Sequence, residues 1–319
     1  MTIEHACTRI VHKPWGSTDL RPWSAIDHDA DAIGELWFQR ADATAPDSAL
    51  LFKLLFTRQP LSIQVHPDDE FARSIGLAHG KDEAWYILSA APNAKIAIGL
   101  KRRLTAPQLR AAIADGSISD LVRWRRALKD DVIFVPAGTI HAIGAGLVLA
   151  EIQQRSDATF RLFDHGRQRA LHVDDGVAAA HAGPAEPQAA LRRLTDARTL
   201  LVASPHFVLE RVDLAAGSTW VLQAEPETWL LVVAGHARVG QTDAVVGEAI
   251  FLEADCASIE VGSDGLKGLL AYAAAEPNPS LLRDLGSRRA EIPNRGLPLP
   301  SPHHRAATWS RTISMEVRP

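Results

Sequence analysis

The sequence has few of the residues that build disulfide frameworks or thiolate metal sites. Only two of its 319 residues are cysteines, Cys7 and Cys256, and they lie far apart along the chain. This count excludes a cysteine-rich metal site and a disulfide framework, and it favours a reducing compartment. The first residues also lack the apolar stretch typical of a secretory signal. We therefore expect a cytoplasmic protein.

Long apolar runs and an excess of one charge are missing as well. No apolar run approaches the roughly 20 residues that a membrane helix needs. The net charge is −4, so neither nucleic acid nor an anionic membrane is expected as a partner. A composition of 46% hydrophobic and 23% charged residues is typical of a soluble globular protein. The oligomeric state stays open.

Short strands separated by turns dominate most of the chain, and short strands at this spacing are typical of a β-sandwich or jelly roll. The predicted strands are 51–56, 61–66, 84–88, 95–100, 132–135, 147–153, 159–163, 207–214, 229–233, 237–239, 249–252, 258–261 and 266–273. The fold class is therefore mostly β, with two β domains in tandem.

Residues 101–129 interrupt the strand pattern and predict a small helical insertion. Thr105 and Gln108 have the spacing of a capping box, and Gly116 suits the end of the helix that follows. A second helix is predicted over 119–128, and a third, short one after Pro67. The stretch 176–190 is typical of a helix or a linker.

These patterns predict three parts. Residues 1–185 form a first domain that includes the insertion 101–129, residues 186–275 form a second β domain, and residues 276–319 form a proline-rich arm. The second domain has His236 at a hairpin, with no neighbouring ligand pair. We therefore expect it to bind no metal.

The run Leu61-Ser-Ile-Gln-Val-His66-Pro67 is the most informative segment of the sequence. Side chains alternate between the two faces of a strand, so Ser62, Gln64 and His66 share one face and the apolar residues share the other. A face with an amide and an imidazole two residues apart must meet water, a partner or a metal. Pro67 then ends the strand, which places the imidazole at its edge.

Three further clusters have polar residues at the edges of apolar strands. Lys81 and Glu83 precede the strand Ala-Trp-Tyr-Ile-Leu, where a plain surface ion pair is the simpler interpretation. His141 lies between a Pro-Ala-Gly turn and a glycine-rich turn, a place where backbone can approach a ligand. Arg161 lies among apolar neighbours and needs an anionic partner, for which Glu151 or Asp157 is a purely structural alternative.

Taken together, these clusters supply two imidazoles, a carboxylate and an amide oxygen. The four residues are Gln64, His66, Glu83 and His141. Such a set, without thiolate, suits a divalent ion such as Zn²⁺ and leaves room for a substrate oxygen.

Four segments in this order resemble type I mannose-6-phosphate isomerases of the short bacterial form. They are LSIQVHPDDEFA, GKDEAWYIL, VPAGTIHAIGAG and EIQQRSDATFRLFDHGR. The resemblance covers about residues 10–175 strongly and 190–275 in general pattern. It implies tandem cupin domains with a helical insertion, and a zinc-dependent aldose–ketose isomerase acting on mannose 6-phosphate and fructose 6-phosphate.

The resemblance also implies roles for single residues. Gln64, His66, Glu83 and His141 would be the ligands of one Zn²⁺ per chain. Lys81, Glu151 and Arg161 would be catalytic residues, with Glu151 a candidate base, and Ser62 and Arg167 match positions near the substrate phosphate.

Two other functions compete with the isomerase. A metal-binding cupin that senses or scaffolds a sugar phosphate would tolerate damage to Lys81, Glu151 or Arg161, and all three are present. A cupin dioxygenase would have three histidines and a glutamate around iron, and Gln64 in place of one imidazole argues against it. The isomerase is the interpretation that uses every cluster.

Overall fold

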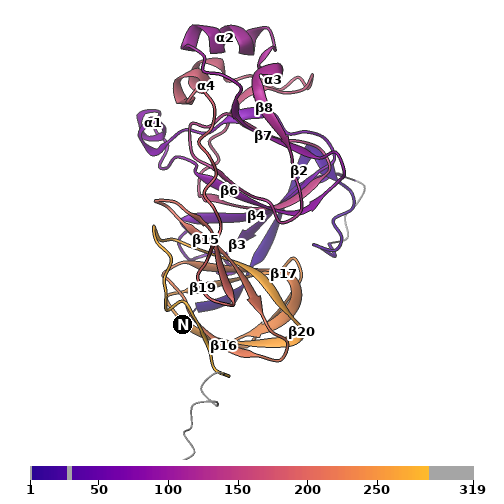
Figure 1. Ribbon diagram of the computed structural model, residues 1–319, viewed down its shortest axis with the longest axis vertical. Coiled ribbons are helices and arrows are strands. Elements are labelled where there is room, and N and C mark those ends of the chain that lie inside the picture. The colour runs from indigo at the N-terminus through magenta and orange to yellow at the C-terminus, as the bar shows by residue number, and fades with distance from the viewer. Residues whose placement is uncertain (1, 27–30, 287–319) are drawn as a thin grey trace, which may run out of the picture.

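Two β-barrels stacked along the long axis make up the protein, with short helices at the far end of the first barrel (Figure 1). The structure is a computed structural model that describes residues 2–26 and 31–286. Most of the arm predicted over 276–319 lies outside the described residues. Among the helices of the described part, none is long and apolar enough to cross a membrane. The predicted fold class, mostly β with a small helical part, is confirmed.

The first barrel is built from two antiparallel sheets. The six-stranded sheet has the order β2 (Cys7–Ser17), β3 (Ile33–Gln39), β4 (Leu50–Thr57), β11 (Leu147–Gln154), β6 (Glu83–Ala90) and β9 (Val132–Val135). The five-stranded sheet has the order β12 (Phe160–Phe163), β5 (Ile63–Val65), β10 (His141–Ile143), β7 (Lys95–Leu100) and β8 (Val122–Arg126).

The second barrel is one ten-stranded sheet that curls on itself. Its main path is β1 (Thr2–His5), β19 (Ala249–Glu253), β17 (Thr228–Val239), β20 (Cys256–Tyr272), β15 (Val208–Leu214), β14 (Arg198–Ala203) and β13 (Arg192–Arg193). Three strands pair off this path: β16 (Thr219–Gln223), β18 (Thr242–Val245) and β21 (Leu282–Asp284). The sheet therefore includes both the first described strand of the chain and the last.

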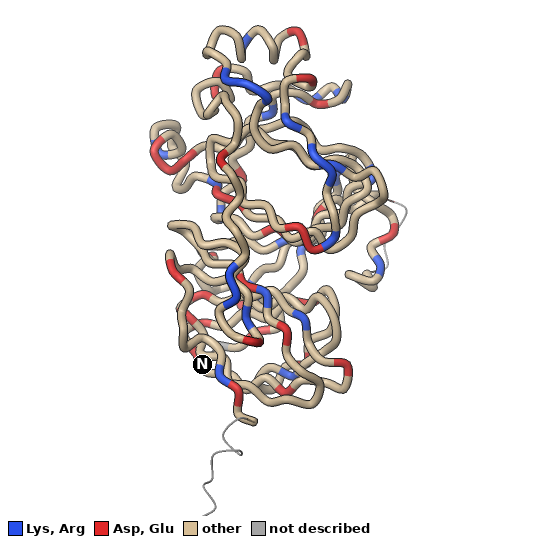
Figure 2. The backbone as a smooth tube through the Cα atoms, viewed as in Figure 1, with Lys and Arg blue, Asp and Glu red and all other residues tan. Residues whose placement is uncertain are grey.

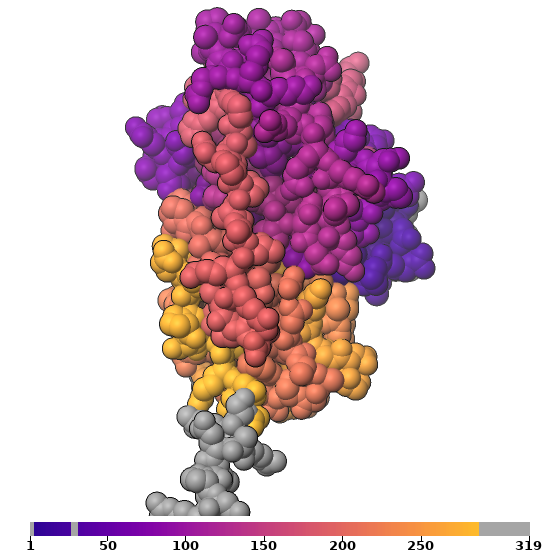
Figure 3. All heavy atoms as spheres, in the orientation of Figure 1, coloured from indigo at the N-terminus to yellow at the C-terminus, as the bar shows by residue number. Residues whose placement is uncertain are grey.

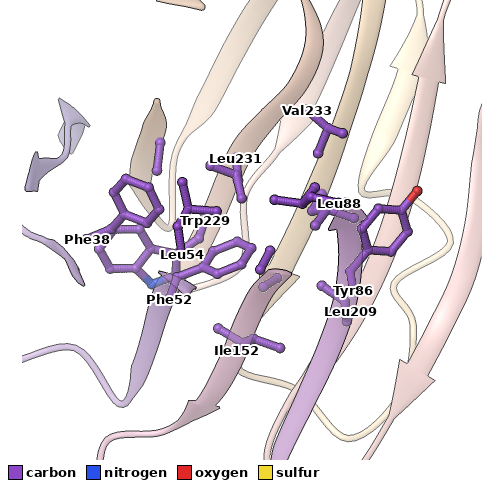
Figure 4. Packing of buried hydrophobic residues seen from close by; sticks show 14 of the residues in the cluster. Phe38, Phe52, Leu54, Tyr86, Leu88, Ile152, Leu209, Trp229, Leu231 and Val233 are labelled. Carbon is purple, nitrogen blue, oxygen red and sulfur yellow. The ribbon is translucent and has the colours of Figure 1, made fainter. Parts of the chain in front are cut away.

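The two barrels share one hydrophobic core. On β4, Phe52 and Leu54 point toward the second barrel and pack in the same cluster as Trp229 and Leu231 of β17 (Figure 4). Lys53, between them in sequence, points the opposite way and lines a cavity inside the first barrel. This alternation is the period-2 geometry of a strand. A space-filling view shows the segment after residue 180 running over the junction of the barrels (Figure 3).

Three of the described helices, α2 to α4, gather at the far end of the first barrel, and α1 lies at the side of that barrel (Figure 1). The helices are α1 (Asp69–Ser74), α2 (Ala106–Ala114), α3 (Ile118–Leu121) and α4 (Val173–Ala179). The predicted capping box of α2 is present, because the Thr105 and Gln108 side chains and backbone N–H groups bond reciprocally. Leu109 and Ile113 of α2 pack on Ile63 and Val65 of β5. The helices thus cover the apolar face of the strand that carries Gln64.

The helix predicted over 119–128 is wrong for most of its length. Helix α3 ends at Leu121, and Val122–Arg126 forms strand β8 instead. β8 pairs with the edge of β7, from Lys95 opposite Arg126 to Leu100 opposite Val122. An open sheet edge with unpaired backbone groups offers hydrogen bonds to this segment, and such tertiary pairing overrides a weak local helical pattern. The stretch 176–190 is helical only up to Ala179.

Candidate functional site

A polar cavity of about 240 Å³ lies inside the first barrel. Its lining combines side chains from both sheets: Lys13, Trp15, Glu35, Lys53, Leu55, Leu61, Ser62, Gln64, Lys81, Ile143, Glu151, Asp157, Thr159, Arg161 and Arg169. A larger, more apolar cavity of about 960 Å³ lies beside the segment that joins the barrels, and none of the predicted site residues lines it. The chemistry predicted from the sequence therefore belongs to the smaller cavity.

His66, Glu83 and His141 meet beside this cavity, in contact with its lining residues Gln64 and Lys81. Three separate strands position them, because His66 follows β5, Glu83 begins β6 and His141 begins β10. One ligand atom from each lies within 4.8 Å of the others, and all three side chains are buried. Glu83 Oε2 is 3.2 Å from His66 Nε2, and Glu83 Oε1 is 3.2 Å from His141 Nε2. The three residues can hold a metal ion.

The hydrogen bonds of the two imidazoles fix which nitrogen is free. His66 Nδ1 lies 2.8 Å from the Ala158 carbonyl oxygen, and His141 Nδ1 lies 2.8 Å from that of Thr139. A carbonyl accepts only, so each Nδ1 carries the proton and each Nε2 presents a lone pair toward Glu83. Orientation of a ligand imidazole by a backbone carbonyl is the usual arrangement at metal centres.

One buried oxygen at the centre of this group lacks a donor. Glu83 Oε1 has no hydrogen-bond partner among the described residues, although the lone pair of His141 Nε2 faces it at 3.2 Å. Two acceptors that face each other in a buried site need a proton or a cation between them. The donor set therefore fits a divalent metal ion.

Gln64 lies next to this triad. It is opposite His141 in the pairing of β5 with β10, and its Nε2 is 3.3 Å from His141 Nε2. Its Oε1 accepts a hydrogen bond from Ser62 Oγ over 3.0 Å. Rotation of the amide by half a turn would direct Oε1 toward the triad, so Gln64 can supply a neutral oxygen there.

Burial and neighbouring charges set the charge states of the triad. Burial and the Lys81 charge lower the pKa of His66 to about 4, and burial also lowers the pKa of His141. Burial acts to raise the pKa of Glu83, but the Lys81 ammonium, with smaller contributions from His66 and His141, outweighs it and holds that pKa well below its usual range. Near neutral pH the triad thus offers two neutral imidazoles and one carboxylate.

Lys81 is a buried ammonium group in contact with the same residues. Its Nζ donates to Glu83 Oε2 over 2.7 Å and lies 3.1 Å from His66 Nε2. Burial favours a lower pKa for Lys81, but the carboxylates of Glu83 and Glu151 outweigh it and raise the pKa. Lys81 therefore stays charged in the cavity.

Glu151 is the second buried carboxylate of the cavity. Its Oε2 accepts from Trp85 Nε1 over 3.1 Å, and its Oε1 lies 3.3 Å from Lys53 Nζ. Burial and the negative charge of Glu83 raise the pKa of Glu151. A carboxylate with a raised pKa is closer to the range in which it can exchange protons near neutral pH.

Arg161 reaches the cavity from β12 with part of its guanidinium free. Nη1 donates to the Ala170 carbonyl over 2.7 Å, whereas Nε is buried and has no hydrogen-bond partner within the described part of the chain. Burial and the nearby charge of Arg169 lower the pKa of Arg161. A buried donor without a partner points to an anionic ligand.

Arg167 and Arg169 are both tied to the buried carboxylate of Asp164. Arg167 Nε donates to Asp164 Oδ1 over 3.1 Å, and Arg169 Nε donates to Asp164 Oδ2 over 2.8 Å. Arg169 lines the cavity and Arg167 does not, its Nη2 donating instead to the Pro60 carbonyl. The structure thus brings a second arginine to the cavity beside Arg161.

Sequence reasoning assigned no role to four charged side chains of the cavity. They are Lys13, Glu35, Lys53 and Arg169. Lys53 gave a usable signal, since it is the one charge in the apolar run of β4 and so had to face a polar interior. Glu35 bridges Lys13 at 3.4 Å and Lys53 at 3.7 Å, which only the sheet order reveals.

Comparison with known proteins places these residues in a family context. The sequence model of the phosphomannose isomerase type I catalytic domain matches residues 31–102. A protein of Streptococcus mutans named mannose-6-phosphate isomerase is 36% identical over 198 residues, which is 60% of this chain and 62% of that protein. The mannose-6-phosphate isomerase ManA of Bacillus subtilis is 33% identical over 201 residues, 60% of this chain and 63% of that protein. The chain thus spans less than two thirds of the length of these relatives.

Solved structures extend the likeness to both barrels. The fold matches a crystal structure of mannose 6-phosphate isomerase from Bacillus subtilis with a TM-score of 0.73 and 24% identity, over 85% of this chain and all of that one. A variant of phosphomannose isomerase from Salmonella typhimurium matches with a TM-score of 0.68 and 16% identity, over 86% of this chain. These likenesses confirm the tandem cupin fold. Together, the matches confirm the resemblance to type I mannose-6-phosphate isomerases, whose catalytic-domain pattern this chain carries at residues 31–102.

Proposed function

We propose that this protein is a metal-dependent aldose–ketose isomerase that interconverts mannose 6-phosphate and fructose 6-phosphate. The observation that carries the proposal is the buried Glu83 Oε1, which has no hydrogen-bond partner among the described residues and lies 3.2 Å from His141 Nε2. Lys81, Glu151 and Arg161 surround the same cavity. The names of the relatives supply the substrate.

Gln64, His66, Glu83 and His141 are the proposed ligands of one divalent ion, and we propose Zn²⁺. The set offers two imidazole nitrogens and two oxygens without thiolate, which zinc accepts. A bound ion would supply Lewis-acid polarisation of the sugar oxygens. Lys81 Nζ lies 2.7 Å from Glu83 Oε2, so this buried carboxylate already pairs with one cation in the cavity.

The isomerisation moves a proton from C2 to C1 of the open-chain sugar through an enediol, with no net oxidation. Glu151 is the candidate base, since its pKa is raised by burial and by Glu83. Arg161 has a buried Nε, without a hydrogen-bond partner in the described part of the chain, with which to stabilise the oxyanion that develops on the enediol. Lys81, an ammonium group in the same cavity, assists ring opening by donating a proton to the ring oxygen.

The phosphate of the substrate is assigned to the arginine side of the cavity. Ser62 lines it, and Arg167 lies behind Arg169 on the shared carboxylate of Asp164. We add Arg169 to the predicted pair of Ser62 and Arg167, because its guanidinium lines the cavity. A planar guanidinium is well suited to phosphate.

We also propose for each part of the chain the role predicted from the sequence. Residues 1–185 are the catalytic part, residues 186–275 are a metal-free cupin, and residues 276–319 are an arm. Strand β1 of the first part and strand β21 of the arm nevertheless pair with strands of the second barrel. Both cysteines are free, which suits a reducing cytoplasm.

A coupled assay tests the function directly. Purified protein is loaded with Zn²⁺, freed of excess metal and supplied with mannose 6-phosphate, and formation of fructose 6-phosphate is measured before and after chelation. We expect turnover that chelation abolishes and added Zn²⁺ restores. Metal-replete protein that binds the sugar phosphate without converting it would instead identify a sensor.

A further inference from the structure

The indole of Trp85 contacts two different groups of the proposed site. Trp85 is fully buried and lies on β6, two residues after Glu83. Its Nε1 donates a hydrogen bond to Glu151 Oε2 over 3.1 Å. Its ring lies edge-on to the His141 imidazole, with 5.6 Å between ring centroids and 66° between planes. One rigid side chain thus touches both a proposed metal ligand and the candidate base.

The strand register places Trp85 in this position. Glu151 of β11 lies directly opposite Trp85 of β6 in the antiparallel pairing. Opposed residues of an antiparallel pair project from the same face of the sheet, so both side chains enter the barrel together. A buried indole N–H needs an acceptor, and the carboxylate supplies it.

The two oxygens of Glu151 have partners of different character. Lys53 Nζ is 3.3 Å from Oε1 but also 3.7 Å from Glu35, so its charge is shared between two carboxylates. The Trp85 N–H is a directional donor on a ring held by packing, and hydrogen bonds weaken steeply when their angle departs from linear. The indole therefore sets the plane of the Glu151 carboxylate more tightly than the ammonium does.

We infer that Trp85 is a positioning residue of the proposed isomerase, whose N–H orients the Glu151 carboxylate relative to the metal site for proton transfer. The inference rests on the proposed function and on Glu151 as its base. Trp85 does not line the cavity, so it acts through Glu151 and not on the sugar itself. Misplacing a catalytic group by about 1 Å can cost on the order of 100-fold in rate, which gives the contact its importance.

The substitution Trp85→Phe tests the role, because phenylalanine keeps an aromatic ring against His141 and removes the N–H. We expect kcat to fall about 10- to 100-fold, with KM and bound metal unchanged. Trp229→Phe is the matched control, since Trp229 Nε1 donates to Glu227 Oε1 over 3.1 Å in the second barrel. We expect it to leave kcat unchanged.

Two results would overturn the inference. One is an unchanged kcat in a Trp85→Phe enzyme with normal metal content. The other is a loss of activity that parallels a loss of metal, which would make Trp85 a packing residue of His141. If Trp85→Phe does not fold, a benzothienyl analogue at position 85, which keeps the indole shape without the N–H, replaces it in the same measurements.

A double-variant experiment tests whether Trp85 acts through Glu151. If it does, adding Trp85→Phe to Glu151→Gln slows the enzyme little further, because residues that act as a unit are not additive. Multiplicative losses would contradict the inference. Wild-type turnover of mannose 6-phosphate is measured first. Its absence would refute the proposed function, whereas an active wild type with an unaffected variant would refute the role of Trp85 alone.

Discussion

Both barrels are built from antiparallel strands, but they differ in the side chains that face their interiors. In the first barrel, Lys53, Glu151 and Glu35 face a polar cavity. In the second, the inward residues of β17, such as Leu230 and Val232, belong to an apolar cluster that fills the barrel. Charged residues of both signs are interspersed over the two barrels (Figure 2). This contrast indicates that the barrel fold alone does not make a functional site. The site depends on which side chains occupy a few inward-facing positions.

One group of buried charges from each barrel shows a difference in how the charges are satisfied. In the second barrel, both nitrogens Nε and Nη2 of Arg198 donate to Glu210, over 2.8 and 2.7 Å, and Tyr272 donates to the same carboxylate over 2.6 Å. In the first, Glu83 Oε1 and Arg161 Nε have no partner among the described residues. Saturated charges stabilise a fold, whereas unsaturated ones leave capacity for a ligand.

The most severe test of this contrast is to remove the carboxylate of the triad. We expect Glu83→Gln to lose both metal and turnover. Loss of a residue that only supports a metal ligand lowers activity by up to about 100-fold, so loss of a ligand itself should lower it by more than that. Metal analysis of the purified variant, alongside the coupled assay, checks this. Full metal content in Glu83→Gln would remove Glu83 from the ligand set.

The next largest effect is expected at the free arginine of the cavity. Because Arg161 would stabilise developing negative charge, Arg161→Ala should lower kcat about 10²- to 10³-fold and leave metal content unchanged. Arg161→Lys keeps the positive charge but loses the planar, two-pronged guanidinium, so it should recover part of the lost kcat. A near-normal rate in Arg161→Ala would exclude the role.

A smaller effect is expected where the arginines are anchored. Asp164→Asn removes a charged acceptor of Arg167 and Arg169, and hydrogen bonds to charged groups contribute about 1.5–3 kcal/mol. We expect KM for the sugar phosphate to rise about 10-fold or more, with a smaller change in kcat. Asp213→Asn is the control, because Asp213 pairs with Arg211 in the second barrel. Equal effects of both substitutions would contradict an anchoring role.

The second barrel should show the opposite pattern. Arg198→Met leaves the buried Glu210 without its main partner, so we expect the free energy of unfolding to fall by about 3–5 kcal/mol. The kcat of the folded variant should not change. Denaturant unfolding and the coupled assay, run on the same preparation, measure the two effects. A drop in kcat without loss of stability would place chemistry in the second barrel.

Much of the local structure could be predicted from the sequence because its causes are local. The capping box at Thr105 depends on side-chain chemistry within one helical turn, and the strands around Phe52 and Ile133 depend on their own apolar residues. The helix predicted over 119–128 was wrong because the conformation of this segment depends on pairing with the open edge of β7, which is distant in sequence.

The sequence alone sets which chemistry the chain can carry, since Gln64, His66, Glu83 and His141 are the same residues in any fold. That they meet, that Arg169 rather than Arg167 lines the cavity, and that Trp85 lies between His141 and Glu151 depend on the tertiary structure. The physical reason is that strand register and sheet order are set by long-range pairing and by burial of the core between the barrels. A local pattern contains neither.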